Sequence, residues 1–418
     1  MAFNLKLNER NNKQNLKVNN FLSPQNINET KKTQKVSHSP ILKKLDDNNN
    51  PVKPLLKNML GRSKSTLEYP QKSDIENDKN IINRIKSYAV KTRKGFIPEK
   101  ADKINQDRAM LIPNLGNIPN LWLFGVFDGH GINGHHSSQF VLNQFPSNFK
   151  SVNITKAILK TTFKAEENPK EPRKLSTIIT EKSNIDFKEE DIKKAFHLTN
   201  NQMNTLNVDF DFSGTTVVTI LLYENKLVCA NAGDSRAILA FQKPLNELKH
   251  LILPNEFQQM NQNEKVWVAL PLSRDHKPDE PDEQERILKA NGRIDPFKEP
   301  NGDPIGPCRV WLKNEEIPGL AMSRSLGDRV AHSVGVTCEP EIFETVLSKD
   351  DKFIVIASDG IWEFLPNDEV VEMIVPFYEA NDPDGACEFL IKESVKHWKE
   401  EDEIIDDITI IVIFLNDE

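Results

Sequence analysis

Cysteine is scarce in this sequence, and the few cysteines are not grouped. The chain of 418 residues contains four, Cys229, Cys308, Cys338 and Cys387. Zinc knuckles and disulfide frameworks both depend on cysteines that recur at short, paired spacings. The sequence therefore supports neither kind of site. It predicts reduced thiols in a cytoplasmic or nuclear compartment.

Long hydrophobic runs are missing as well. The longest run, Ile408 to Leu415, is far shorter than the roughly 20 residues that cross a bilayer as a helix. Polar and charged residues interrupt Met1 to Asn20 before the apolar part of a secretory signal can form, and Ala2 excludes N-terminal myristoylation. We therefore expect a soluble protein, and no membrane signal is evident.

Acidic charge is sparse at the start of the chain. Residues 1–80 carry 15 Lys or Arg against 8 Asp or Glu, a net charge of +7, whereas the remainder carries 39 against 54, a net charge of −15. The first part also contains 15 Asn and few aromatic residues, so it cannot bury enough apolar surface to offset the entropy of ordering. We predict a basic, Asn-rich, disordered tail over residues 1–85 and a folded domain over residues 86–418.

The basic tail could be a docking segment for a partner, a localisation signal or a phosphorylation target. Its basic clusters are Lys31 to Lys35, Lys43-Lys44 and Arg62 to Ser65. Nucleic-acid binding has weaker support, because no aromatic residues interleave with these clusters and no recognisable nucleic-acid-binding module is present. A solvated tail is the simplest interpretation.

One apolar segment of the folded domain ends in residues that can do chemistry. Leu121 to Gly131, LWLFGVFDGHG, has the composition of a strand buried on both faces, and it leads into Asp128, Gly129 and His130. A strand of this kind can deliver a carboxylate and an imidazole to a metal site. Asp-Gly is also the commonest two-residue hairpin turn, so a plain turn is the alternative at this point.

Other carboxylates also lie at the edges of apolar strands. Asp234 follows a predicted β-hairpin over Gly214 to Ala240, Asp359 follows Phe353 to Ala357, and Asp406 precedes the last strand. Several buried carboxylates brought together repel one another and require cations, and ligands that are all oxygen select Mg²⁺ or Mn²⁺. Two such ions can activate a water and hold a phosphoryl group. Ordinary turn caps are the alternative for each of these Asp residues.

The remaining segments have simpler patterns. The sequence predicts helices over Gly134 to Phe145, Ile192 to Leu206 and Pro281 to Asn291, the second with a core-packing stripe. Residues 150–187 are polar and predict an insertion or long loop. Residues 293–319 contain so many Pro and Gly residues that we expect no regular structure there, only a surface flap.

The order of several short motifs resembles one family. The chain is similar to the metal-dependent serine/threonine protein phosphatases of type 2C across about residues 88–416. The matching blocks are KINQD at 103–107, GVFDGHG at 125–131, SGTT at 213–216, ANAGDSRAIL at 230–239, LSRDHKP at 272–278, AMSRSLGD at 321–328, IASDGIWE at 356–363 and DDIT at 406–409. The resemblance implies an α+β fold, a central sandwich of two antiparallel β-sheets flanked by α-helices on both outer faces. Metals would lie in a cleft at one end.

The resemblance also implies a metal-ligand set. Asp128 would bridge two Mg²⁺ or Mn²⁺ ions, the carbonyl of Gly129 would bind one of them, and Asp359 and Asp406 would bind the other. The family's ligand is the first of the two carboxylates before the last strand, which selects Asp406 over Asp407.

Further roles follow from the same resemblance. Asp107 would act on the metals directly or through water, and Asp234 with Glu363 would form a weaker third metal site, with local capping and salt bridging as the alternative for that pair. His130 would be the general acid that protonates the leaving serine or threonine oxygen, a step suited to imidazole near neutral pH.

Two departures from the family pattern affect the site. Many members have Arg before the first acidic block, where this chain has Lys103. Lysine can grip a substrate phosphate as a point charge but not as a bidentate fork. Many members also have Glu-Asp where this chain has Gln106-Asp107, so one carboxylate is replaced by a neutral amide.

The resemblance implies hydrolysis of phosphoserine and phosphothreonine in protein substrates. It implies direct attack of a metal-bridging water, without a phosphoenzyme. The alternatives are a catalytically silent phosphatase-like scaffold and a two-metal phosphodiesterase. We further expect a monomer that can dock partners through the basic tail.

Overall fold

The computed structural model describes residues 84–98, 100, 102–151, 187–248, 263–401 and 403–416. Residues 1–83 of the predicted disordered tail and most of the predicted insertion at 150–187 lie outside these residues. Strand β1 begins at Ile85, one residue before the boundary predicted for the folded domain. None of the described helices combines the length and apolar character that a membrane crossing requires.

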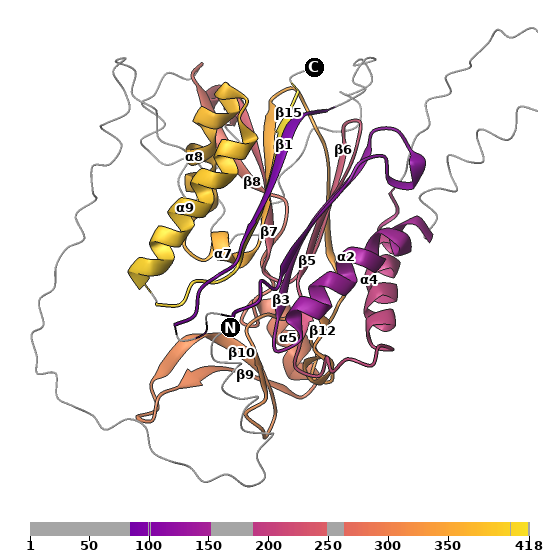
Figure 1. Ribbon diagram of the computed structural model, residues 1–418, viewed down its shortest axis with the longest axis vertical. Helices are drawn as coiled ribbons and strands as arrows, with labels where there is room; N and C mark the ends of the chain where they lie inside the picture. The colour runs from indigo at the N-terminus through magenta and orange to yellow at the C-terminus, as the bar shows by residue number, and fades with distance from the viewer. Residues whose placement is uncertain are drawn as a thin grey trace, which may run out of the picture.

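Two antiparallel sheets form the centre of the protein, and helices cover both outer faces (Figure 1). The predicted α+β sandwich is therefore confirmed. One sheet has five strands in the order β1-β15-β14-β7-β8. These strands are β1 (Ile85–Arg93), β15 (Ile408–Leu415), β14 (Asp351–Ala357), β7 (Arg236–Pro244) and β8 (Lys265–Pro271).

The second sheet has seven strands in the order β12-β4-β3-β5-β6-β13, with β2 paired to β3. Its strands are β12 (Leu326–Gly327), β4 (Gly214–Thr215), β3 (Leu121–His130), β5 (Val217–Tyr223), β6 (Lys226–Ala232), β13 (Glu341–Val346) and β2 (Asp107–Ile112). The predicted hairpin is the pair β5 and β6, in which Tyr223 faces Lys226 across a two-residue loop.

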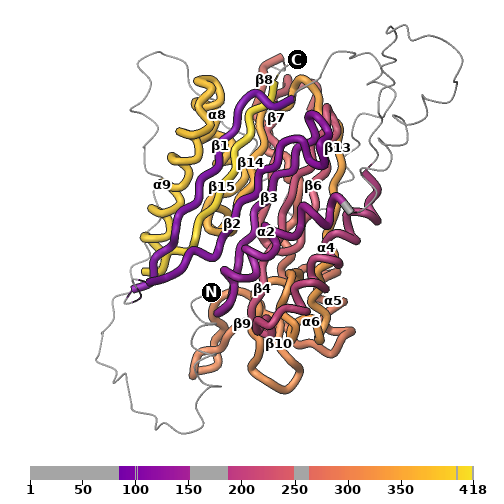
Figure 2. The backbone as a smooth tube through the Cα atoms, turned by 45° about the vertical axis from the view of Figure 1, so that its right-hand side comes forward, coloured from indigo at the N-terminus to yellow at the C-terminus, as the bar shows by residue number. Residues whose placement is uncertain are grey.

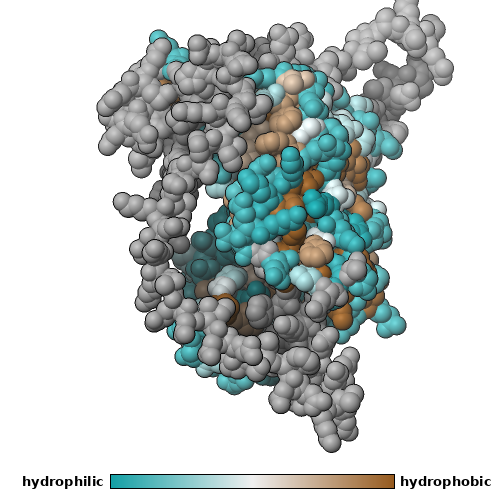
Figure 3. Space-filling model, turned by 60° about the vertical axis from the view of Figure 1, so that its left-hand side comes forward, coloured by the Kyte–Doolittle hydropathy of each residue, from teal (hydrophilic) through white to brown (hydrophobic). Residues whose placement is uncertain are grey.

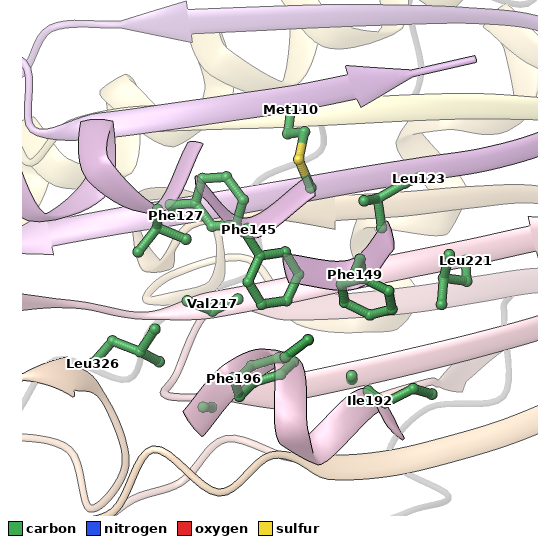
Figure 4. Packing of buried hydrophobic residues seen from close by; sticks show 14 of the residues in the cluster. Met110, Leu123, Phe127, Phe145, Phe149, Ile192, Phe196, Val217, Leu221 and Leu326 are labelled. Carbon is green, nitrogen blue, oxygen red and sulfur yellow. The ribbon is translucent and has the colours of Figure 1, made fainter. Parts of the chain in front are cut away.

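The helices divide between the two outer faces. Helices α2 (Gly134–Ser151) and α4 (Glu189–Met203) lie on the seven-stranded sheet, and α8 (Asn367–Ala380) and α9 (Pro383–Glu401) lie on the five-stranded sheet (Figures 1 and 2). Helix α2 is longer than predicted, and α4 agrees with the predicted amphipathic stripe. In Figure 4, Phe145 and Phe149 of α2 and Phe196 of α4 point toward one another beside Phe127 of β3.

Strand β14 shows why these strands are apolar along their whole length. Phe353 and Val355 face the core under α8 and α9, while Ile354 and Ile356 face the core between the sheets. Successive side chains of a strand point to opposite faces, so a strand with a core on each side must be apolar at every position. Strands β3 and β15 follow the same pattern, which positions their ends rigidly.

The prediction that residues 293–319 lack regular structure is wrong. A three-stranded sheet occupies this region, made of β9 (Gly292–Lys298), β10 (Pro304–Leu312) and β11 (Pro318–Leu320), below the sandwich in Figure 1. Gly302 is in the turn, Gly306 lies within the register shift of β9 and β10, and Pro304 and Pro318 are the first residues of β10 and β11. Gly and Pro at a turn or bulge leave the regular pairs intact.

The smaller helices complete the chain. Helix α5 (Pro281–Lys289) confirms the predicted helix that ends before Gly292, α6 spans Arg329–His332 and α7 spans Asp359–Trp362. Two short 3-10 helices cover Leu115–Asn117 and Leu245–Leu248.

Candidate active site

Strand β3 carries Asp128, Gly129 and His130 as part of the strand itself. Asp128 faces Asp107 of β2 across the sheet, and its carbonyl accepts a hydrogen bond of 2.9 Å from the Thr216 N–H. Gly129 faces Thr215 of β4 in the same way. The hairpin-turn alternative for this Asp-Gly pair is therefore wrong, because the backbone remains extended as far as His130.

Gly129 is required by two backbone segments that approach it closely. A Cβ atom at this position would lie 2.2 Å from the carbonyl oxygen of Gly134 and 2.7 Å from that of Gln106. Any side chain would therefore push the start of α2 and the segment before β2 away from the strand. The glycine serves close approach between backbone segments.

The ends of β14, β7 and β15 meet at one edge of the five-stranded sheet. Ala357, at the end of β14, faces both Arg236, which begins β7, and Ile410 of β15. This register brings Asp359, the first residue of α7, to the same edge as Asp234 and Asp406. Three carboxylates from distant parts of the sequence therefore lie at the same end of the sandwich.

Hydrogen bonds made by hydroxyl groups join the two sheets at this edge. The Ser358 hydroxyl lies 2.7 Å from Asp107 Oδ2, to which it donates, and it accepts the Thr409 N–H at 3.0 Å. A second link joins the Thr216 and Ser235 hydroxyl oxygens, 2.7 Å apart. The sandwich thus brings Asp107 and Asp128 of one sheet to Asp359 and Asp406 of the other.

Asp107 and Asp128 are buried, Asp359 and Asp406 are half-buried, and the four carboxylates repel one another. Burial raises the pKa of Asp128 well above its usual value, and the charges of Asp359, Asp107 and Asp406 raise it further. Burial and then the charges of Asp234 and Asp406 raise the pKa of Asp359. Burial together with neighbouring carboxylates raises the pKa of Asp107 to about 7. The ionised cluster is therefore unfavourable unless positive charge is added.

The chemistry of this cluster fits hard divalent cations. Buried oxygens of Asp107, Asp359 and Asp234, Oδ1 in each case, have no hydrogen-bond partner among the described residues. Within those same residues, no group of three or more Asp, Glu, His or Cys side chains is close enough together to hold a metal ion as it stands. Oxygen ligands of this kind suit Mg²⁺ or Mn²⁺, whose charge would offset the mutual repulsion of the carboxylates.

Asp406 and Asp407 differ in what surrounds them. Both oxygens of Asp407 are used by the protein: Oδ1 accepts the Gly95 N–H at 2.6 Å, and Oδ2 accepts the Gln106 N–H at 2.8 Å. Asp407 therefore holds two loop segments in place. In Asp406, Oδ1 accepts the Asp407 N–H at 2.7 Å. The choice of Asp406 over Asp407 as the metal ligand stays a prediction.

Lys103 lies at the edge of the carboxylate cluster. Its Nζ is 2.6 Å from Asp407 Oδ1 and 3.9 Å from Asp406 Oδ1, and its side chain is 12% exposed. The ammonium group thus has an internal carboxylate partner and is positioned within the site. Its contact with a substrate phosphate stays a prediction.

Asp234 and Glu363 lie in different surroundings. Asp234 Oδ2 is 2.5 Å from Lys277 Nζ, and although burial opposes it, the Lys277 charge lowers the pKa of Asp234. The structure thus shows Asp234 in a salt bridge. Glu363 is exposed at the end of α7. The third metal site at these two residues stays a prediction. Lys277 belongs to the LSRDHKP block, but 43 residues separate it from Asp234, so no local pattern in the sequence predicts this salt bridge.

His130 forms a buried pair with Asp328. Its Nε2 lies 2.6 Å from Asp328 Oδ2, and the Ser325 hydroxyl donates to the same oxygen at 2.6 Å. Among the described residues, the buried Nδ1 of His130 has no hydrogen-bond partner. Nothing local to Asp328 in the sequence predicts this contact, because 198 residues separate it from His130.

Space for this pair is provided by Gly214. A Cβ atom there would lie 2.1 Å from Asp328 Oδ2. Asp328 itself has a left-handed backbone with φ of 44°, a conformation that non-glycine residues seldom adopt. The local structure thus accommodates a carboxylate directed at His130.

Comparison with known proteins gives consistent results. The family model described as "Protein phosphatase 2C" matches residues 116–402. The chain is 33% identical over 343 residues to "Probable protein phosphatase 2C 35" of Arabidopsis thaliana, covering 78% of this chain and 83% of that protein. It is 34% identical over 315 residues to "Probable protein phosphatase 2C 72" of the same plant, covering 75% and 82%.

A solved structure supports the fold. The crystal structure of serine-threonine phosphatase 2C from Toxoplasma gondii superposes with a TM-score of 0.58 at 19% identity, covering 80% of this chain and 98% of that one.

Proposed function

The chain belongs to the protein phosphatase 2C family and is a protein serine/threonine phosphatase, and we propose from this that it hydrolyses phosphoserine and phosphothreonine with the help of two Mg²⁺ or Mn²⁺ ions. The observation that carries the metal dependence is the buried carboxylate cluster of Asp107, Asp128, Asp359 and Asp406. Lys103 and Lys277 offset only part of the negative charge of these four carboxylates, which makes a poor structural core but a suitable cation site.

We propose that the Asp128 carboxylate would help to hold both ions. The Gly129 carbonyl and Asp107, directly or through water, would hold one of them, and Asp359 with Asp406 would hold the other. When bound, such ions acidify the attacking water and neutralise charge on the phosphoryl group. Water would attack phosphorus directly, so no side chain needs to become phosphorylated.

His130 is the proposed proton donor to the leaving group. Because the Asp328 carboxylate accepts hydrogen bonds, the proton on Nε2 is directed at Asp328, and Nδ1 is the nitrogen left for the departing oxygen. Asp328 would hold the ring in this orientation. Lys103 would add positive charge beside the substrate phosphate.

The alternatives have less support. A catalytically silent scaffold would not need to keep Asp128, Asp359 and Asp406 together in one buried cluster. A two-metal phosphodiesterase does not agree with the family match. Docking through the basic tail, a monomeric state, and a cytoplasmic and/or nuclear location stay proposals. The tail lies almost entirely outside the described residues.

Removal of metal is expected to abolish turnover. The purified protein should hydrolyse a phosphothreonine peptide in Mn²⁺, lose that activity in excess chelator and regain it when Mn²⁺ is restored, because the carboxylates alone offer no positive charge to the phosphate. Release of inorganic phosphate measures the effect. Absence of turnover in Mn²⁺ across the neutral pH range would overturn the proposed function, and full activity in chelator would overturn the metal dependence.

Substitution of His130 is expected to affect substrates unequally. His130→Ala should lower kcat on a phosphothreonine peptide by about 100-fold or more, the usual contribution of a general acid. The loss on p-nitrophenyl phosphate should be much smaller, since that leaving group departs without a proton. Asp328→Asn should show the same selectivity to a lesser degree.

His136→Ala provides the matched control. His136 lies in α2 on the exposed surface, six residues from His130, and should leave both rates unchanged. Equal losses on the peptide and on the aryl phosphate would show that His130 does not act as the acid.

A further inference from the structure

Exposed apolar side chains gather near the candidate active site. Among the described residues four large hydrophobic side chains are more than half exposed: Phe96 at 54%, Ile104 at 55%, Ile132 at 59% and Leu288 at 52%. Leu288 lies on α5, whereas the other three lie in the segments that hold the carboxylate cluster together. We define Phe96, Ile104 and Ile132 as the apolar rim.

Phe96 is placed by the strand that carries a proposed metal ligand. Its N–H donates to the carbonyl of Ile405 at 2.7 Å, and the Ile405 N–H donates back to the Phe96 carbonyl at 2.8 Å. Asp406 directly follows Ile405. Figure 2 shows β1 and β15 side by side, so the residues after β1 and before β15 lie at the same end of the sheet. Phe96 therefore borders the cluster.

Ile104 and Ile132 are connected through Gln106. The Gln106 side-chain amide donates to the carbonyl of Gly131 at 2.8 Å, which ties the segment of Ile104 to the segment of Ile132. Ile104 follows Lys103, whose Nζ is 3.9 Å from Asp406 Oδ1, and Ile132 is two residues beyond His130. Both isoleucines thus lie beside residues proposed to act in the reaction.

The apolar rim is held in place before any substrate arrives. Asn133, the residue after Ile132, makes two hydrogen bonds. Its side-chain amide donates to the Asp209 carbonyl at 2.8 Å, and its backbone N–H donates to the Ser213 hydroxyl at 3.0 Å. Gly95, before Phe96, is anchored on Asp407 at 2.6 Å. A preorganised apolar surface loses little conformational entropy on binding.

The surroundings make this rim distinct. Hydrophilic side chains predominate over the described surface in Figure 3, with hydrophobic ones in small groups between them. None of the three rim residues contributes to the hydrophobic cores. Apolar groups that serve no core and border a site are typical of recognition surfaces.

We propose that the apolar rim selects phosphoprotein segments that carry large apolar side chains next to the phosphoserine or phosphothreonine. The proposal rests on the proposed phosphatase function. The phosphate would bind at the cation site that the carboxylate cluster forms, and the flanking side chains of the extended substrate segment would lie against Phe96, Ile104 and Ile132. Substrate choice then depends on apolar contact in addition to charge.

Two phosphothreonine peptides test this proposal on the full-length protein. They have equal charge and differ only in the residues on either side of phosphothreonine, Leu in one and Ser in the other. The wild-type protein in Mn²⁺ should favour the Leu peptide by about tenfold in kcat/KM, the scale expected for a small apolar contact. The triple variant Phe96→Ser, Ile104→Ser, Ile132→Ser should lose that preference.

Leu288→Ser is the matched control, since it removes an equally exposed apolar side chain that belongs to α5 and to none of the three rim segments, and it should retain the preference. Turnover of p-nitrophenyl phosphate, which has no flanking residues, should be unchanged in every variant. Equal wild-type rates on the two peptides, or an equal loss on both in the triple variant, would overturn the proposal. Failure of the wild-type protein on all three substrates would instead overturn the phosphatase function itself.

If the triple variant does not fold, as judged by circular dichroism, the three single substitutions replace it. At least one should reduce the preference for the Leu peptide severalfold, and an undiminished preference in all three would overturn the proposal.

Discussion

Asp359→Asn is expected to lower turnover of a phosphothreonine peptide by at least about 1000-fold, equivalent to about 4 kcal/mol of transition-state stabilisation. Asp359 begins α7 just after β14, is half-buried, and has a buried Oδ1 without a partner among the described residues. The amide keeps the shape of the side chain but removes the negative charge. It should therefore weaken cation binding with little change in fold.

The fold of this variant should even gain stability in chelator. The substitution removes one of the mutually repelling charges that raise the pKa of Asp128 and Asp359. Phosphate release, Mn²⁺ titration calorimetry and thermal unfolding in chelator measure the three effects. Lower turnover and weaker Mn²⁺ binding together with higher stability in chelator are expected where an active site reduces the stability of the fold.

Asp351→Asn is the matched control, because Asp351 lies at the opposite end of the same strand. Its carboxylate accepts the Ser348 N–H at 2.6 Å and the Ser348 hydroxyl at 3.0 Å, far along β14 from the cluster. This variant should retain turnover per folded molecule. Unchanged turnover in Asp359→Asn would refute the ligand assignment.

The second large effect concerns pH. In chelator, the free energy of unfolding is expected to fall as the pH rises from about 4 to about 7. The pKa of Asp107 is raised from 3.8 to about 7, so between these values the folded state binds more protons than the unfolded state. Stability is then fully present below the unfolded pKa and is lost as the pH rises through the folded pKa.

Asp107 alone would contribute on the order of 4 kcal/mol to this loss. The raised pKa values of Asp128, Asp359 and Asp406 act in the same direction. Urea unfolding at about pH 5 and about pH 8 measures the slope, and saturating Mn²⁺ should reverse it by binding the folded state. Asp107→Asn should flatten the slope in chelator. A slope of the opposite sign in the wild-type protein would contradict the electrostatic description of the cluster.

Several elements could be predicted because their signal is local. The apolar runs of β3, β14 and β15 reflect a core on each face, and the stripe from Ile192 onward reflects packing of α4 on a sheet. Such patterns depend on which residues are buried, and the spacing of apolar residues in the sequence indicates this. The motif order then indicated which carboxylates would meet.

Other features depend on tertiary contacts that no local pattern records. The Pro and Gly residues of β9 and β10 predicted irregular structure, although they lie at the turn, at a register shift or at the first residue of a strand, and Trp311 is buried in the small sheet. The pairing of His130 with Asp328, and of Asp234 with Lys277, joins residues far apart in sequence. Only the assembled sheets determine these contacts.

The two-sided burial of β14 also limits how this chain can change in length. Deletion of one residue before Ala357 would exchange the faces of Ile354 and Val355 and turn Asp359 away from Asp128, because side chains alternate along a strand. The packing of both cores and the arrangement of the carboxylate cluster would be disrupted by the same change. Insertions and deletions can therefore accumulate only in the connections between strands. The length of β14 and the position of the carboxylate after it must be retained together.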